Sequence, residues 1–222
     1  MNSIYLRLSI EDACNLRCRY CRPERDLDLG EPDWEEHPLL GTEDLLELVA
    51  ACQRVRPIRK LRLTGGEPLI RSDVVDLVSR FRERFGQAEI CLTSNGFRLT
   101  ELAGPLRRAG LDRINLSLDT LDPDAYRELT RGGDLDSALA RIQAARQAGF
   151  ETLKLNTVLV RSVNGGHLHE LVRFALDQHC EVRFIELMPI SVAAGIHRDE
   201  FYSADEALAE LREHFEDRGE AS

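Results

Sequence analysis

Short β-type runs alternate with helical runs along the whole chain of 222 residues. The runs predicted as strands are Ile4–Ile10, Lys60–Thr64, Glu89–Ser94, Arg113–Leu118, Leu153–Val160 and Glu181–Leu187. The runs predicted as helices are Thr42–Val55, Ser72–Phe85, Leu99–Ala109, Ser137–Ala148, Gly166–Gln178 and Ser203–Phe215. Strands that alternate with helices form parallel sheets through right-handed crossovers. The alternation therefore predicts an α/β fold, either a barrel or a doubly wound sheet.

Glycine follows three of the predicted helices, at Gly86, Gly110 and Gly149. Many helices end in a left-handed residue, which is usually glycine. We expect a left-handed cap at each of the three positions.

A long segment after the first predicted strand breaks the alternation. It contains three of the six cysteines and the acidic, proline-containing piece Glu31–Pro38. In a parallel barrel the loops at the carboxyl ends of the strands carry the chemistry, so we expect the active site there. No boundary between domains is visible in the sequence, and residues 1–222 are predicted to form one core domain.

The charge balance is acidic, with 29 Lys and Arg against 39 Asp and Glu and a formal net charge of −10. Such a chain is not attracted non-specifically to nucleic acid or to an anionic membrane surface, and an anionic ligand must be met by local basic residues. The first residues lack a basic stretch followed by an apolar one, and no apolar run approaches the roughly 18 residues of a membrane span. We therefore expect a cytoplasmic protein with no nucleic-acid or membrane partner.

Polar residues alternate with apolar ones in four of the predicted strands. These polar residues are Arg7, Ser9, Arg62, Thr64, Asn115, Ser117, Lys154 and Asn156. Strands of a parallel sheet usually read as continuous apolar runs, so one face of this sheet is polar. The face is either exposed to solvent or lines a barrel lumen in which Arg7, Arg62 and Lys154 surround an anion. The helices between the strands favour the lumen, because they must cover the apolar face.

Three cysteines, Cys14, Cys18 and Cys21, have the spacing Cys-x3-Cys-x2-Cys and place three thiols on one loop. A structural zinc site needs four protein ligands, and a second cysteine pair is absent, although His37 could be the fourth ligand. A cubane iron–sulfur cluster held by three thiolates leaves one iron open to an outside ligand. A disulfide is disfavoured by the odd number and by a reducing compartment. The remaining cysteines are expected to be inert core residues: Cys52, Cys91 and Cys180.

The second predicted strand ends in Gly65-Gly66-Glu67-Pro68. Glycines at the end of a strand allow a ligand to approach the backbone closely. Alone this motif is typical of an ordinary turn, but its position after the cysteine triplet makes the combined pattern specific.

The combined pattern resembles the radical S-adenosylmethionine (SAM) superfamily, whose signature is Cys-x3-Cys-x2-Cys followed by Gly-Gly-Glu-Pro. Further segments resemble the GTP 3′,8-cyclase family, which carries out the first step of molybdenum cofactor biosynthesis. These segments are Leu6–Ser9, Asp12–Cys21, Arg62–Leu69, Thr93–Gly96, Arg113–Asp119 and Arg183–Met188. The resemblance covers nearly the whole chain.

The resemblance implies a partial (β/α)6 TIM-type barrel with a [4Fe–4S] cluster on Cys14, Cys18 and Cys21. S-adenosyl-L-methionine would chelate the fourth iron and be cleaved to a 5′-deoxyadenosyl radical. That radical would take hydrogen from the ribose C3′ of GTP, and the carbon radical would attack C8 to give 3′,8-cyclo-7,8-dihydro-GTP, a lyase reaction. The cofactor carries the radical chemistry, so no side chain is predicted to be catalytic in itself.

The resemblance also implies the binding residues. The family's SAM contacts fall on four positions: Tyr20, Gly66, Ser117 and Met188. Its GTP contacts fall on four others: Arg7, Arg62, Thr93 and Lys154. Three of these GTP positions belong to the basic face that strand alternation predicts, and arginine suits a triphosphate because its planar fork donates two hydrogen bonds. His167, His169 and His179 are predicted to be helix-surface residues.

The chain departs from the cyclase family after Cys180, where no further cysteine occurs. The family carries a second cluster on Cys-x2-Cys-x13-Cys in a C-terminal extension. Three interpretations remain: a fragment that stops before the second-cluster region, which we favour, a single-cluster radical enzyme with another substrate, or a degenerate copy. From a different class, an electron-transfer protein or a zinc module stays open. GTP is the expected substrate and a flavodoxin- or ferredoxin-like protein the expected reductant; a homodimer is one option for the assembly.

Overall fold

A computed structural model of the chain describes residues 3–21, 39–189 and 193–216. Its strands are β1 (Ile4–Ser9), β2 (Ile58–Thr64), β3 (Glu89–Ser94), β4 (Arg113–Ser117), β5 (Leu153–Leu159) and β6 (Cys180–Glu186). Its helices are α1 (Thr42–Val55), the 3-10 turn η2 (Pro68–Ile70), α2 (Val74–Arg84), α3 (Leu99–Arg108), α4 (Pro123–Thr130), α5 (Leu135–Gln147), α6 (Arg161–Asn164), α7 (Leu168–Asp177), α8 (Ala193–Glu200) and α9 (Ala204–His214). The strands form one parallel sheet in the order β1 to β6, so the predicted α/β class is confirmed.

Contacts divide the described residues into two compact units. The first unit comprises residues 3–15, 39–117 and 136–154, and the second comprises residues 16–21, 118–135, 155–189 and 193–216. The first unit therefore carries β1 to β4, whereas the second carries β6 and helices α4 and α6 to α9. A single core domain over residues 1–222 stays a prediction.

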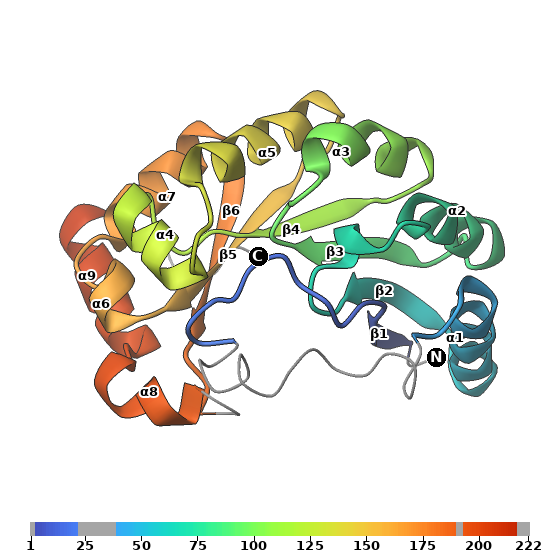
Figure 1. The fold of residues 1–222 in the computed structure, drawn as a ribbon, viewed down its shortest axis with the longest axis horizontal. Helices are drawn as coiled ribbons and strands as arrows, with labels where there is room; N and C mark the ends of the chain where they lie inside the picture. Colours follow the sequence, from blue (N-terminus) through green and yellow to red (C-terminus); the bar gives the residue numbers. More distant parts are fainter. Residues whose placement is uncertain (1–2, 22–38, 190–192, 217–222) are drawn as a thin grey trace. The chain divides into compact units, whose positions relative to one another are not determined.

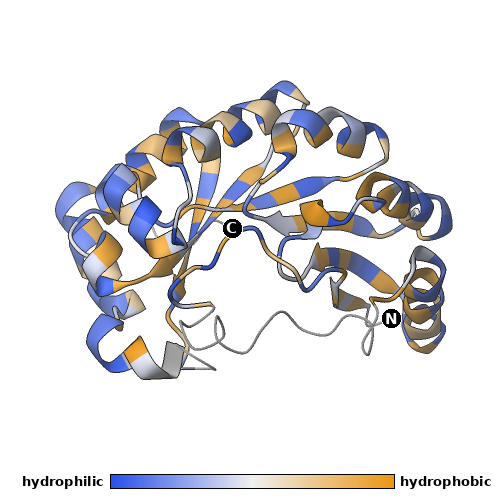
Figure 2. Ribbon diagram, viewed as in Figure 1, coloured by the Kyte–Doolittle hydropathy of each residue, from blue (hydrophilic) through white to orange (hydrophobic). Residues whose placement is uncertain are grey.

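The core of the first unit is built from alternating strand residues and amphipathic helices. Leu61 and Leu63 in β2 are fully buried, and so are Ile90 and Leu92 in β3. Helices α1, α2 and α3 lie along one side of these strands (Figure 1). In α2 the buried residues follow the helical spacing of an apolar stripe, namely Val74, Leu77, Val78 and Phe81. Figure 2 shows the resulting alternation of hydrophobic and hydrophilic residues along the strands.

In the second unit, Arg161, the first residue of α6, forms hydrogen bonds to residues at the start of α9. Its guanidinium donates to the Phe201 carbonyl at 2.8 Å and to Glu206 Oε1 at 2.8 Å. Glu206 also forms a capping box with Ser203, which satisfies backbone N–H groups at the first turn of α9. These contacts fix where the last described helix begins.

The structure differs from the sequence-based expectations in its short elements. Helices α4, α6 and α8 were not predicted, because four to eight residues are too few for a clear helical period. Gly110 and Gly149 have the expected positive φ, at 99° and 86°, but Gly86 does not. The prediction for Gly86 is wrong because α2 already ends at Arg84, with Phe85 as its C-cap.

Two further expectations concern the long segment after β1 and the absence of a membrane span. The piece Glu31–Pro38, with the candidate zinc ligand His37, lies outside the described residues. Among the helices that the structure describes, none is long and apolar enough to cross a membrane.

Candidate active site

The Gly-Gly-Glu-Pro motif holds the backbone of the first cysteine loop. The Gly66 N–H donates to the Glu11 carbonyl at 2.6 Å, and the Glu67 N–H donates to the Ala13 carbonyl at 2.8 Å. A Cβ atom on Gly66 would lie 2.3 Å from the Ala13 oxygen, well inside van der Waals contact. The chain segment that approaches these glycines is therefore the loop that leads into Cys14.

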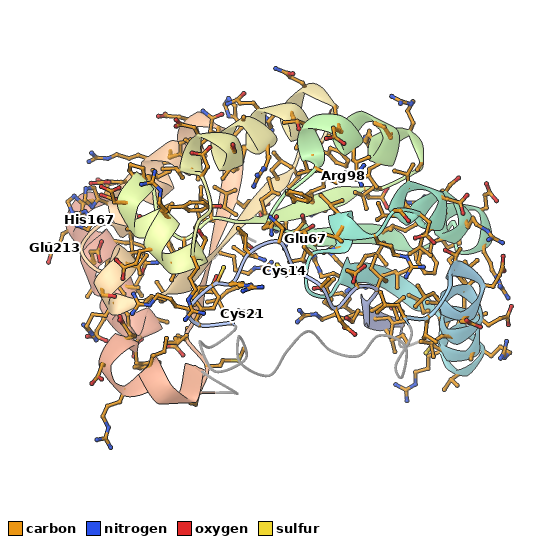
Figure 3. All side chains as sticks on the ribbon, in the orientation of Figure 1. Cys14, Cys21, Glu67, Arg98, His167 and Glu213 are labelled. Carbon is orange, nitrogen blue, oxygen red and sulfur yellow. The ribbon has the colours of Figure 1, made fainter. Side chains whose placement is uncertain are left out.

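Glu67 connects the ends of β2 and β3. Its carboxylate is buried and accepts hydrogen bonds from the Leu69 N–H at 2.9 Å, the Ser94 hydroxyl at 2.7 Å and the Asn95 N–H at 2.7 Å. Burial raises the pKa of Glu67 above its usual range, and these hydrogen bonds oppose that shift. The side chain thus fixes the turn from inside, and Figure 3 shows it next to Cys14.

None of the three cysteines of the triplet forms a disulfide with another described residue, and the three fall in different units. Cys14, in the first unit, is partly buried, and Asn95 Nδ2 lies 3.8 Å from its sulfur. In the second unit the Cys21 N–H donates to the Cys18 carbonyl at 2.9 Å, and Cys21 is exposed. Among the described residues, no three Cys, His, Asp or Glu side chains stand close enough to hold one metal ion. A cubane cluster binds one thiolate per iron, so its ligands stand farther apart than those of a single ion.

Tyr20 connects the segment that carries Cys18 and Cys21 to the rest of the second unit. The Tyr20 hydroxyl donates to Asp119 Oδ2 at 2.7 Å, and the Val158 N–H donates to Asp119 Oδ1 at 2.7 Å. Burial raises the pKa of Asp119 to about 6 despite these two hydrogen bonds. Burial, followed by the nearby Asp119, raises the pKa of Tyr20 well above its usual value, so the phenol stays protonated.

One face of the first unit is polar, as alternation predicts for β1, β2 and β4, and Thr93 of β3 lies on the same face. Arg7 and Arg62 are register partners on β1 and β2, and Thr93 is the partner of Asn115 on β3 and β4. Arg62 is 6% exposed; it donates to the Thr93 hydroxyl at 2.9 Å and to the Tyr5 hydroxyl. Among the described residues, neither arginine forms an ion pair with a carboxylate, although Glu89 lies near enough to interact with the charge of Arg62. The face therefore presents two guanidinium groups from adjacent strands.

Comparison with known proteins decides the family. Residues 8–175 match the Radical SAM superfamily. The chain belongs to the radical SAM superfamily. A GTP 3′,8-cyclase of Pseudomonas putida (strain W619) is 45% identical over 214 residues, which are 95% of this chain and 62% of that protein. The chain thus spans less than two thirds of the length of this relative.

Solved structures agree on the fold. Methylornithine synthase (PylB) superposes with a TM-score of 0.65 at 20% identity, over 95% of this chain and 62% of that one. SuiB of Streptococcus suis, solved with bound S-adenosylmethionine, superposes with a TM-score of 0.63 at 19% identity, over 82% of this chain and 38% of that one. The cofactors of this radical SAM chain are a [4Fe–4S] cluster and S-adenosyl-L-methionine. Three cysteine thiols on one short stretch, none of them in a disulfide with a described residue, are the donors that such a cluster takes.

The remaining predicted site residues of the radical SAM chain are placed separately. Ser117, at the end of β4, and Lys154, in β5, are partly buried members of the first unit. Met188 follows β6 in the second unit and is 56% exposed. The structure brings Arg62 and Thr93 into direct contact and aligns Arg7 with Arg62, whereas the assignment of all these residues to ligands stays a prediction.

Several contacts around the radical SAM motifs were not predicted from the sequence. Tyr5 lies two residues before Arg7, so strand alternation could have placed it on the polar face. Lys60, which the sequence suggests as an added charge or a rim residue, is paired with Glu89, whose carboxylate lies 2.8 Å from its ammonium. Asn95 and Asp119 lie in segments that resemble the cyclase family, but their partners are distant in the sequence and could not be predicted from it.

Expectations for the other cysteines and histidines are partly confirmed. Cys91 and Cys180 are buried, but Cys52 on α1 is only partly buried. His167 is exposed at the start of α7, with Glu170 at 3.4 Å. The prediction for His169 needs correction, since its ring stacks on His214 with centroids 4.0 Å apart and its Nδ1 is buried.

Proposed function

We propose that this radical SAM chain converts GTP to 3′,8-cyclo-7,8-dihydro-GTP in molybdenum cofactor biosynthesis. Support comes from a relative of that name, which is 45% identical over 95% of the chain. Further support comes from the polar face of the first unit, whose residues match the GTP positions of the cyclase family.

The alignment of Arg7 with Arg62 on adjacent strands is the observation that most supports an anionic substrate. Neighbouring strands lie about 4.8 Å apart, so the two arginines leave adjacent positions on one face of the sheet and can reach the same anion. Arg62 is buried and Arg7 is exposed, so water screens the charge of Arg62 less. An anion with several acceptor oxygens accepts paired hydrogen bonds from arginine. The triphosphate of GTP has this chemistry, and Thr93 and Lys154 would bind it from β3 and β5.

The cofactor residues in this proposal are the three cysteines and four SAM contacts. Cys14, Cys18 and Cys21 would hold the cluster. When bound, the cluster would supply the electron that cleaves SAM and starts radical chemistry on the ribose of GTP. Gly66 would offer backbone to SAM at a place where a side chain does not fit. The other proposed SAM contacts are Tyr20, Ser117 and Met188.

The structure limits what Tyr20 can contribute. Its hydroxyl is committed to Asp119, and its ring packs against the buried cluster of Leu129, Val160 and Val163. A contact between Tyr20 and SAM would therefore use its backbone or ring edge. The external electron donor and the homodimer remain predictions.

The proposal is tested by anaerobic reconstitution of the full chain with iron and sulfide. We expect about four irons and four sulfides per chain, and with dithionite, SAM and GTP we expect 5′-deoxyadenosine and the cyclised nucleotide by mass spectrometry. Cys18→Ser should lose the iron, while Cys52→Ser, which changes a partly buried cysteine on α1, should keep it.

Other results identify the alternatives. One zinc and no iron would establish a metal-binding module instead. A redox-active cluster that leaves SAM intact would indicate an electron-transfer protein. SAM cleavage without a cyclised nucleotide would indicate a radical enzyme with another substrate.

A further inference from the structure

We propose that Asn95 is a positioning residue for Cys14, and that its side-chain amide donates to the Cys14 sulfur and raises the reduction potential of the cluster. This inference rests on the proposed function, because it takes Cys14 as a cluster ligand. Asn95 belongs to none of the predicted ligand sets, and it lies just after β3, 81 residues from Cys14 in the sequence.

Four hydrogen bonds fix Asn95 from both its backbone and its side chain. Its backbone N–H donates to Glu67 Oε2 at 2.7 Å, and its Oδ1 accepts from the Phe97 N–H at 2.9 Å. Its Nδ2 donates to Asn15 Oδ1 at 2.9 Å and lies 3.8 Å from the Cys14 sulfur. The side chain therefore spans the short gap between its own turn and the cysteine loop.

These contacts also determine which end of the amide faces the sulfur. An amide flip would turn Oδ1 away from the Phe97 N–H and would place it against Asn15 Oδ1, so two hydrogen bonds would be lost. The donor end must then face the loop. Because Nδ2 carries two hydrogens, one reaches Asn15 and the other is directed to the Cys14 sulfur.

A donor on a ligating sulfur has a defined physical consequence. The N–H stabilises negative charge on the sulfur, and the reduced cluster carries one more electron than the oxidised one. The hydrogen bond therefore favours the reduced form and raises the potential. It also holds the first thiol in place before iron arrives, as outer contacts do at other metal sites. Glu67 extends this support, since it holds both the Asn95 backbone and, through its own N–H, the loop carbonyl of Ala13.

The test compares three variants of the reconstituted full chain. Asn95→Ser keeps an oxygen that can accept from the Phe97 N–H but is too short to reach Cys14. Asn95→Asp keeps that acceptor and loses both donors. The matched control is Asn15→Ala, which removes the other acceptor of Nδ2 and leaves the contact with Cys14.

The readout is the midpoint potential of the cluster, measured by a dithionite titration followed by electron paramagnetic resonance, together with iron content and circular dichroism. For Asn95→Ser we expect the ratio of reduced to oxidised cluster at a fixed solution potential to fall about tenfold, or about 59 mV for one electron. The shift should be larger for Asn95→Asp, because a carboxylate adds negative charge. Asn15→Ala should keep the wild-type potential.

Each other outcome also decides the inference. Full iron content with an unchanged potential in both Asn95 variants would overturn it, and so would an unfolded chain in both, which would make Asn95 a general structural residue. Iron loss from folded Asn95 variants, with normal iron in Asn15→Ala, would support the positioning role. A wild-type chain that binds no iron would refute the proposed function itself, and this inference with it.

Discussion

Substitution of Gly66 by alanine should destabilise the first unit through a steric clash rather than through backbone conformation. Gly66 does not have a positive φ, so alanine can adopt its conformation. The new Cβ would lie 2.3 Å from the Ala13 oxygen and 2.5 Å from the Asp12 oxygen. Ordinary contact begins at 3.4 Å, so the cysteine loop must retreat by about 1 Å.

That displacement breaks the two backbone hydrogen bonds that hold the loop, those from the N–H groups of Gly66 and Glu67. Each costs about 1 kcal/mol, and more if the donor stays buried without a partner. Alanine also stabilises the folded state by about 0.4–1 kcal/mol, because it lowers the conformational entropy of the unfolded chain. We expect a loss of about 1–1.6 kcal/mol in the free energy of unfolding, or roughly 2–6 °C in Tm.

The assay is urea denaturation of the apo chain, followed by circular dichroism, with iron content measured after reconstitution. The matched control is Gly104→Ala in α3, where the new Cβ meets only the flexible end of Arg108, at 3.2 Å. Gly104→Ala should be neutral or stabilising, by up to about 1 kcal/mol. Because Ala13 directly precedes Cys14, Gly66→Ala should also lower the iron content. Equal stability of the two variants would refute the steric explanation.

Two further predictions address the substrate and the pH dependence. Arg62→Ala should raise the dissociation constant for GTP about 10- to 150-fold, as expected for a lost hydrogen bond to a charged group. Calorimetry should show no change for Arg59→Ala, an exposed arginine at the register shift near the start of β2. Equal losses in both variants would contradict an anion site at Arg62. Asp119 has a pKa of about 6 in the folded chain, above its unfolded value near 4, so the folded state binds more protons and its stability falls as pH rises from about 4 to 6. Relative to Asp119→Asn, the wild type should lose up to about 3 kcal/mol across this range in denaturation curves, and parallel curves would contradict the shift.

The sequence by itself determined the periodic features of this protein. Alternation in β1 and β2 predicted a polar face with Arg7 and Arg62, because side chains on a strand change face at every residue. The cysteine spacing and the glycines of the Gly-Gly-Glu-Pro motif were likewise readable, since each depends on residues that are neighbours in the chain. These local patterns were sufficient for the fold class and for the superfamily.

Only the tertiary structure decided which distant residues meet. Packing showed that the glycines make room for the backbone before Cys14, that Glu67 joins two strand ends, and that the Asn95 amide faces the Cys14 sulfur. The Tyr20 hydroxyl likewise finds Asp119 across 99 residues of sequence. Such pairings depend on strand register and on how loops close over the sheet, and residue spacing encodes neither of these. The hydrogen-bond partner of a polar side chain therefore depends on the packing of the whole fold. The face of the sheet on which a residue lies depends only on its position in the strand.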